Sequence, residues 1–381
     1  MKYLQNDFEE RTMTSEEMLT EYLEFRKKND IWCKPAVNET SVVGLGISAD
    51  PGEADKDLQI PDDVRRAAMA DNRLLFAFPY NLMPTIMPIR YTAFPDICNR
   101  AGLKGRTIES FTPKTNISVL DPVVKAYFLS TGLSLNAYEC NVLIRDEKVS
   151  SVKSNEYKIF PEYELIDLLK AELSRTWENF TFKQAAVSHE YLTTSYLLNA
   201  TDMEESFRLR LEDMGVVTVP TIKAGVQLAT SDVGNSAVSI ATFYEMDGVR
   251  VYLGAPLKIR HDKGKTLDDV AEAFKKIASI FREAEDEIEV LGNTDIQYPA
   301  DCLLNIVDEF TLPKTVAKDV AATMQKENAT ALDVYIALNE IVEKHYKTSK
   351  MTLTSLIEMS ETVARLMTFD FSRFDLPAEN E

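Results

Sequence analysis

The sequence predicts an α+β fold, with a mixed or antiparallel sheet core and a helical C-terminal region. Three observations predict it. Strand-like runs concentrate between residues 140 and 259, and Asp247-Gly248 is a strong hairpin turn signal. The helices before residue 262 do not alternate regularly with these strands. After Thr266 the pattern is almost wholly helical, so we expect an α+β core domain over 1–262 and a helical region over 263–381.

The first half of the chain begins with a helix signal. Thr14-Ser15-Glu16-Glu17 has the pattern of a capping box, and apolar residues at helical spacing continue to Asn29. Pro84 and Pro88 lie in a segment that we expect to be irregular or an edge strand, because proline cannot donate to a strand ladder. The elements expected before residue 139 are this helix over 14–29, a loop over 48–53, a helix from 61, a strand over 74–78, the proline-containing segment over 82–90, and helices over 94–102 and 121–138.

The second half contains the sheet and the later helices. Two strand-like runs flank Asp146-Glu147-Lys148 and predict a β-hairpin. Leucines 165, 168, 169 and 173 form one stripe and predict a helix over 161–177. The remaining elements expected are strands over 181–187 and 191–197, a helix over 203–214, a β region over 216–259, and helices over 266–291, 300–310, 313–326, 331–346 and 353–369.

Composition limits the class of protein. The 381 residues are 45% hydrophobic and 27% charged, as in ordinary globular proteins. No apolar run approaches about 18 residues, and the acidic N-terminus lacks the apolar core of a signal peptide, so we expect no membrane association. The four cysteines are scattered, which predicts reduced thiols in a cytoplasmic protein.

The charge is strongly acidic but unevenly distributed. A net charge of −19 excludes a protein coated uniformly with basic surface for nucleic acid. Residues 250–265 nevertheless carry five basic residues against Asp262, a net of +4, whereas residues 281–310 carry nine acids against Arg282, a net of −8. A local basic site is therefore compatible with this acidic protein.

The segment from Gly225 to His261 carries the most candidate functional residues. Its polar run includes Ser231, Asp232 and Asn235, and Arg260-His261 closes it. A serine, an acid and a histidine can form a hydrolytic site when they meet in space, but the G-x-S-x-G elbow is missing. The alternative is a turn or β-bulge in which the same residues bond local amides.

Two further groups of basic residues could contact phosphate. Arg260-His261 precedes a helix beginning at Thr266, whose free amides and positive dipole end favour anions, although a solvated basic turn is the alternative. Arg100, Lys104 and Arg106 lie among aromatic residues, a mixture typical of single-stranded nucleic-acid binding, although the aromatic residues could also be core. The three histidines lie far apart and no metal-ligand spacing exists, so we expect neither a metal nor a cofactor.

Several segments, taken in order, resemble a family of phage- and plasmid-like proteins catalogued as domain of unknown function 932. Residues 94–103 resemble its early helix and glycine turn, and 142–149 with Ser154-Asn155-Glu156-Tyr157 resemble its hairpin and Ser-x-x-Tyr element. Residues 230–237 are similar to its Asn-Ser-Glu-x-Gly segment, with Thr230 in place of the asparagine, and Arg260-His261 matches a later pair. Val251 to Ala255 stands where the family often carries Cys-x-Asn-Gly. The resemblance implies a mobile-element origin.

Together these features predict a phage- or plasmid-type cytoplasmic accessory protein that binds a partner. Single-stranded nucleic acid, during replication or recombination, is the partner we expect. The predicted binding residues are Ser231, Asp232, Asn235, Arg260, His261, Arg100, Lys104 and Arg106. Two alternatives stay open: a hydrolytic enzyme using Ser231, Asp232 and His261, and a structural or assembly protein of a phage that forms a homo-oligomer.

Overall fold

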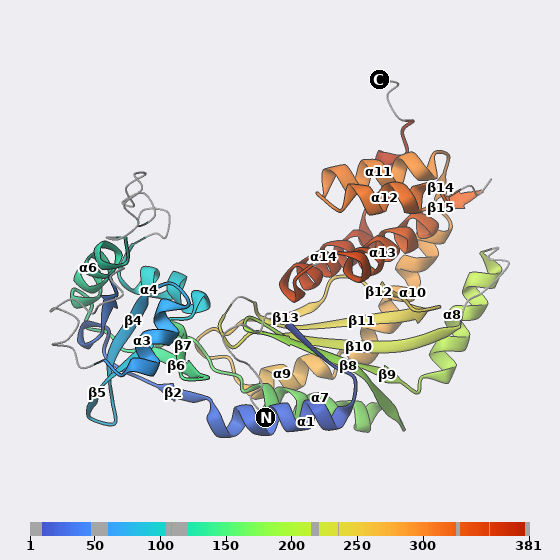
Figure 1. Cartoon of the computed structure of the whole chain (residues 1–381). Helices are drawn as coiled ribbons and strands as arrows, with labels where there is room; N and C mark the ends of the chain where they lie inside the picture. The colour runs from blue at the N-terminus through green and yellow to red at the C-terminus, as the bar shows by residue number, and fades with distance from the viewer. Residues whose placement is uncertain are drawn as a thin grey trace.

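The structure is a computed structural model that describes residues 10–46, 60–103, 108, 121–214, 221–234, 236–324, 328–349 and 351–377. It confirms the predicted α+β class, because its sheets are built from antiparallel pairs and the chain after residue 266 is mainly helical. Figure 1 shows two lobes side by side, joined near the end of the first helix. We call residues 31–154 the small lobe, and residues 10–30 together with 155–377 the large lobe.

The large lobe is built on a seven-stranded antiparallel sheet. Its strands run in the order β1 (Glu10–Met13), β8 (Phe180–Ser188), β9 (Leu192–Leu198), β10 (Ile222–Thr230), β11 (Val238–Met246) and β12 (Val249–Tyr252), and β13 (Leu257–Ile259) also pairs with β11. Gly225 on β10 lies under the ring of Phe243 on β11, and a Cβ there would come within 2.3 Å of that ring. This position therefore requires glycine for the two strands to pack at this register.

Helices cover both faces of this sheet. In Figure 1, α1 (Glu16–Asn29), α7 (Glu162–Thr176) and α9 (Leu267–Phe274) lie on one face, and α13 (Ala331–Thr348) and α14 (Leu353–Arg365) lie on the other. Because both faces are covered, β10 is buried along almost its whole length. The large lobe also contains α8 (Thr201–Asp213), α10 (Ile277–Gly292), β14 (Asp295–Ile296), α11 (Pro299–Glu309), α12 (Lys314–Ala321) and β15 (Ala329–Thr330).

The small lobe has its own core. One sheet contains β2 (Ile31–Cys33), β6 (Cys140–Arg145) and β7 (Lys148–Ser154), and the other contains β3 (Ser41–Gly44), β4 (Leu74–Tyr80) and β5 (Met83–Pro88). The described part of this lobe also contains the α-helices α3 (Asp62–Met69), α4 (Phe94–Arg100) and α6 (Asp121–Ser134). A hydrophobic cluster drawn from residues 37–152 fills this lobe and is separate from the cluster of the large lobe.

The helices after residue 262 do not form a separate core. They share one hydrophobic cluster with the seven-stranded sheet and with α1 and α7. The lobes therefore divide the chain near residues 30 and 155, and a domain boundary at residue 262 stays a prediction.

One predicted helix is wrong. The segment 266–291 forms two helices, α9 and α10, which are separated at Lys275-Lys276. Each half packs on different neighbours: α9 contacts α7 and β13, whereas α10 contacts α13 and β11. A straight helix could not follow both surfaces. Among the described residues, no helix has the length and apolar character needed to cross a membrane.

Candidate functional site

The polar run after β10 forms a tight turn. The Gly234 amide donates to the Ser231 carbonyl oxygen at 3.2 Å, and Gly234 has a φ of +72°, which favours glycine. Ser231 is fully buried and Asp232 is buried beside it. Asn235 lies outside the described residues. The structure therefore builds a turn at this place, as one of the two interpretations of the sequence predicted.

Asp232 and His261 are both buried, but they bind different partners. Asp232 accepts a hydrogen bond from Arg145 Nη2 at 2.7 Å. The His261 Nδ1 lies 2.8 Å from the Lys158 carbonyl oxygen, which can only accept, so Nδ1 carries the proton. The His261 ring stacks on Tyr157, with centroids 4.8 Å apart. Because a carbonyl oxygen rather than Asp232 orients the imidazole, the acid–histidine pair of a hydrolytic triad is not formed.

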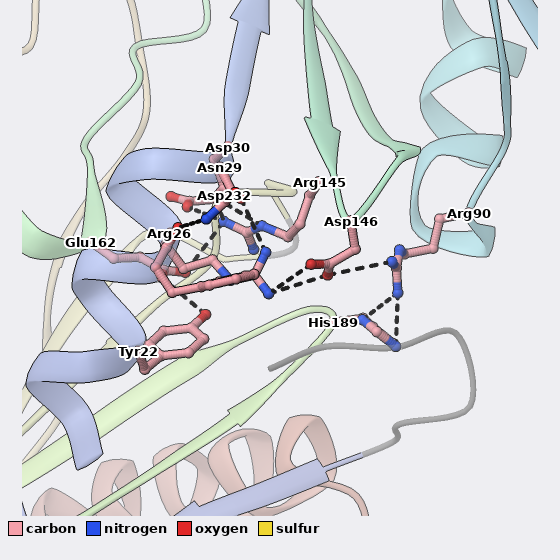
Figure 2. Close-up of polar contacts among 11 residues, drawn as sticks. Tyr22, Arg26, Asn29, Asp30, Arg90, Arg145, Asp146, Glu162, His189 and Asp232 are labelled. Atoms are coloured by element: carbon pink, nitrogen blue, oxygen red, sulfur yellow. Dashed lines mark hydrogen bonds and ion pairs between the residues drawn. The ribbon is translucent and has the colours of Figure 1, made fainter. Parts of the chain in front are cut away.

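Arg145 is the centre of a buried ionic network, shown in Figure 2. It lies at the end of β6, and its side chain is only 3% exposed. Besides Asp232, it donates from Nε to Asp30 at 2.9 Å and lies 3.8 Å from Glu162. This guanidinium of the small lobe therefore contacts three carboxyl groups of the large lobe: Asp30 after α1, Glu162 at the start of α7 and Asp232 after β10.

Two further arginines extend the network. Arg26 on α1 donates to Asp30 at 3.0 Å and to both carboxylate oxygens of Asp146 at 3.1 Å. Arg90, which follows β5, lies 2.8 Å from His189 Nε2 and also contacts His189 Nδ1. Burial, together with the neighbouring Arg90 charge, lowers the pKa of His189 to about 3, so this imidazole is neutral at physiological pH.

Glu162 and Asp232 form a pair of buried carboxyl groups within the network. Burial, together with the negative charge of Asp232, raises the pKa of Glu162 to about 8. Burial also raises the pKa of Asp232, while Arg145 opposes that increase. The Tyr22 hydroxyl donates to Glu162 Oε2 at 3.1 Å. With a proton on Glu162, the three arginines balance the three remaining carboxylates (Asp30, Asp146 and Asp232).

The network joins the two lobes. Arg145 of the small lobe binds Asp232 of the large lobe, Arg26 of the large lobe binds Asp146 of the small lobe, and Arg90 contacts His189 across the same junction. Removing so many charges from water is costly, and the cost is recovered only in a geometry where every charge is paired. The network therefore fixes how the lobes sit on each other and contributes orientation more than stability.

The other predicted binding residues lie apart from this network. Arg260 is exposed and lines an open groove of about 650 Å³ beside α9. Asp269 and Thr266 form a capping box at the start of α9, so part of the predicted anion site is filled by the chain's own carboxylate. Lys258, Lys263 and Lys265 each pair with an acid. This arrangement favours the solvated basic turn.

Arg100 ends α4, and its guanidinium lies 5.9 Å from the centroid of the Tyr138 ring. Lys104 and Arg106 lie outside the described residues. Within the described part of the chain, no group of three or more His, Cys, Asp or Glu side chains is placed to hold a metal ion.

Most of this network is not predicted by the sequence, although two of its members carry a local signal. Arg26 falls on the apolar stripe of α1 with Leu19 and Tyr22, and Glu162 falls on the stripe of α7 with Leu165. A charged residue in line with core positions is uncommon, because burying an unpaired charge is costly. Such a position predicts a buried ionic partner. Apart from Asp30, which lies four residues after Arg26, the partners come from distant parts of the chain.

Comparison with protein-family models, with curated proteins and with solved structures yields no match to this chain.

Proposed function

We propose that this chain is an accessory protein of a mobile element that binds single-stranded nucleic acid on its small lobe. The observation that carries the proposal is the distribution of charge. Residues 31–154 contain 14 Lys and Arg against 14 Asp and Glu, a net charge of zero, so the rest of the chain carries the whole −19. A polyanion is repelled least by the small lobe.

Exposed aromatic side chains favour a single strand, rather than a duplex, as the nucleic-acid ligand. The small lobe exposes Tyr91, Tyr127 and Tyr138, which are 51%, 69% and 39% exposed. Unpaired bases stack on such rings, whereas the bases of a duplex are already stacked on one another. The large lobe would hold the small lobe in a fixed orientation through the ionic network between them.

The geometry of the other candidate residues also favours binding over hydrolysis. Asp232 is engaged by Arg145, and His261 is oriented by a backbone carbonyl. The resemblance to phage- and plasmid-like proteins supports the mobile-element part of the proposal.

Filter binding of labelled single-stranded DNA tests this function. We expect retention at about 50 mM salt that weakens steeply by about 200 mM, because binding releases the counterions of the phosphates. A duplex of the same length serves as the control ligand and should bind more weakly than the single strand. If the purified protein retains no single strand at the lower salt, the proposed function is wrong.

A further inference from the structure

The strand β13 is a short free edge of the seven-stranded sheet. Among the described strands it pairs with β11 alone. The open groove of about 650 Å³ beside α9 is lined by four consecutive residues, 257–260, of this strand and its end. Successive side chains of a strand point to opposite faces, so a groove that touches four residues in a row runs along the edge of the strand. The backbone of β13 therefore borders the groove.

The register of β13 shows which of its backbone groups face the groove. The Leu253 amide donates to the Thr242 carbonyl oxygen at 2.9 Å, so the even-numbered residues of β11 direct their backbone groups toward β12 and β13. The even-numbered residues opposite β13 pair as Val238 with Ile259 and Ile240 with Leu257. Lys258 lies between these two hydrogen-bonded pairs, and its N–H and C=O therefore point away from β11 into the groove.

These two backbone groups of Lys258 have no hydrogen-bond partner among the residues that the structure describes. A charged side chain on an edge strand commonly keeps other strands away. The Lys258 side chain is instead drawn to α14, which covers the sheet face opposite to α9 (Figure 1), and its Nζ pairs there with Glu361 at 2.5 Å. On the groove side, α9 forms a wall whose first turn is fixed by a capping box between Thr266 and Asp269. The edge is thus open and lies beside a rigid wall.

The charges around the groove do not select a charged ligand. Its lining contains four basic and four acidic side chains, a net charge of zero. The basic residues are Lys258, Arg260, Lys265 and Lys276, and the acidic residues are Asp262, Asp268, Asp269 and Glu272. Neither a polyanion nor a polycation is favoured here, and the unpaired backbone of β13 is the feature that a ligand can recognise.

We propose that the groove between β13 and α9 binds an extended segment of a partner protein, which pairs with the backbone of Lys258 and adds a strand to the sheet. An extended polypeptide presents the N–H and the C=O of one residue on the same edge, which is the arrangement needed to pair with Lys258. A nucleic-acid strand lacks backbone N–H donors. The inference is independent of nucleic-acid binding, which the proposed function assigns to the small lobe.

Replacing Lys258 by proline tests the inference, because proline lacks the N–H that would donate to the partner. Proline is tolerated where an edge amide points away from the sheet, so K258P should fold, which circular dichroism can check. K258A also loses the ion pair to Glu361 but keeps the N–H, and it is the matched control. The probe is a displayed library of short random peptides, depleted on K258P and then selected on the unchanged protein. The selected peptides should bind K258P about 5- to 150-fold more weakly than K258A, because a peptide carbonyl oxygen left without a donor costs about 1–3 kcal/mol.

Amide exchange of the unchanged protein gives a second readout, which needs no variant and decides alone if K258P does not fold. Without peptide, the Lys258 amide should exchange faster than the amides of Leu257 and Ile259, and a selected peptide should slow it. The inference is wrong if depletion leaves no peptide that binds, if K258A loses binding as K258P does, or if a bound peptide leaves the exchange of Lys258 unchanged. If sedimentation shows a dimer that K258P dissociates, the occupant is a second copy of this chain and the separate partner is excluded.

Discussion

Replacing Arg145 by methionine is expected to lower the free energy of unfolding by about 3–5 kcal/mol. Arg145 is buried and contacts Asp30 and Asp232, so its loss leaves the buried Asp232 without its arginine partner and leaves the half-buried Asp30 with Arg26 alone. A methionine fills part of the space but cannot neutralise either charge. Urea unfolding followed by circular dichroism would measure the change.

Arg208 offers a matched control for this substitution. It forms ion pairs with Glu205 and Glu212 on α8, and its side chain is 38% exposed. We expect R208M to change the unfolding free energy by no more than about 1 kcal/mol, because water solvates the carboxylates that remain. Adding D232N to R145M should recover part of the loss, since it removes the buried carboxylate that R145M leaves without an arginine partner. Equal effects of R145M and R208M would contradict a structural role for the network.

Replacing Glu162 by glutamine is expected to change how stability depends on pH. The pKa of Glu162 is raised from its ordinary value of 4.5 to about 8 in the folded protein. Between these two values the folded state holds a proton that the unfolded state has released, so the unfolding free energy falls as pH rises. Glutamine resembles the protonated carboxyl and does not titrate. The stability of E162Q relative to the unchanged protein should therefore increase with pH.

Unfolding at pH 6.5, 7.5 and 8.5 would measure this effect. The lowest of these values equals the ordinary pKa of histidine. His189 is neutral in the folded protein at all three, because its pKa there is about 3. We expect the difference between E162Q and the unchanged protein to grow by at most about 1.4 kcal/mol per pH unit, and to level off above pH 8. E172Q is a control on the same helix, where Glu172 pairs with the exposed Arg175. A difference that stays constant with pH would show that Glu162 is ionised in the folded protein.

Local sequence signals located most elements of this fold. The two runs around Asp146 form the predicted hairpin, and Asp146 and Glu147 take up the positive φ values of a two-residue turn. Asp247-Gly248 forms a turn of the same kind between β11 and β12. The segment with Pro84 and Pro88 is an edge strand, as expected where two prolines lack the N–H that donates to a neighbouring strand. These features depend on neighbouring residues and are therefore readable from sequence.

The arrangement of the lobes could not be predicted in the same way. The sequence does not predict the short strands β1, β2 and β3, because three or four residues give too little periodicity. Two of them, β1 and β2, also pair with strands far along the chain. The network presents the same difficulty, since Arg145 meets Asp30 and Asp232 over 115 and 87 residues of sequence. The polar run after β10 indicates Asp232 as a candidate residue, but nothing in the local sequence indicates its partner Arg145.

Hydrogen exchange with and without a single-stranded oligonucleotide tests the central claim most directly, namely that the small lobe binds single-stranded nucleic acid. Binding should slow exchange of the backbone amides around α4 and α6, in the segments 94–103 and 121–138, and leave α8, α11 and α12 unchanged. Slower exchange confined to the large lobe, or no change at an oligonucleotide concentration that saturates binding, would contradict the account.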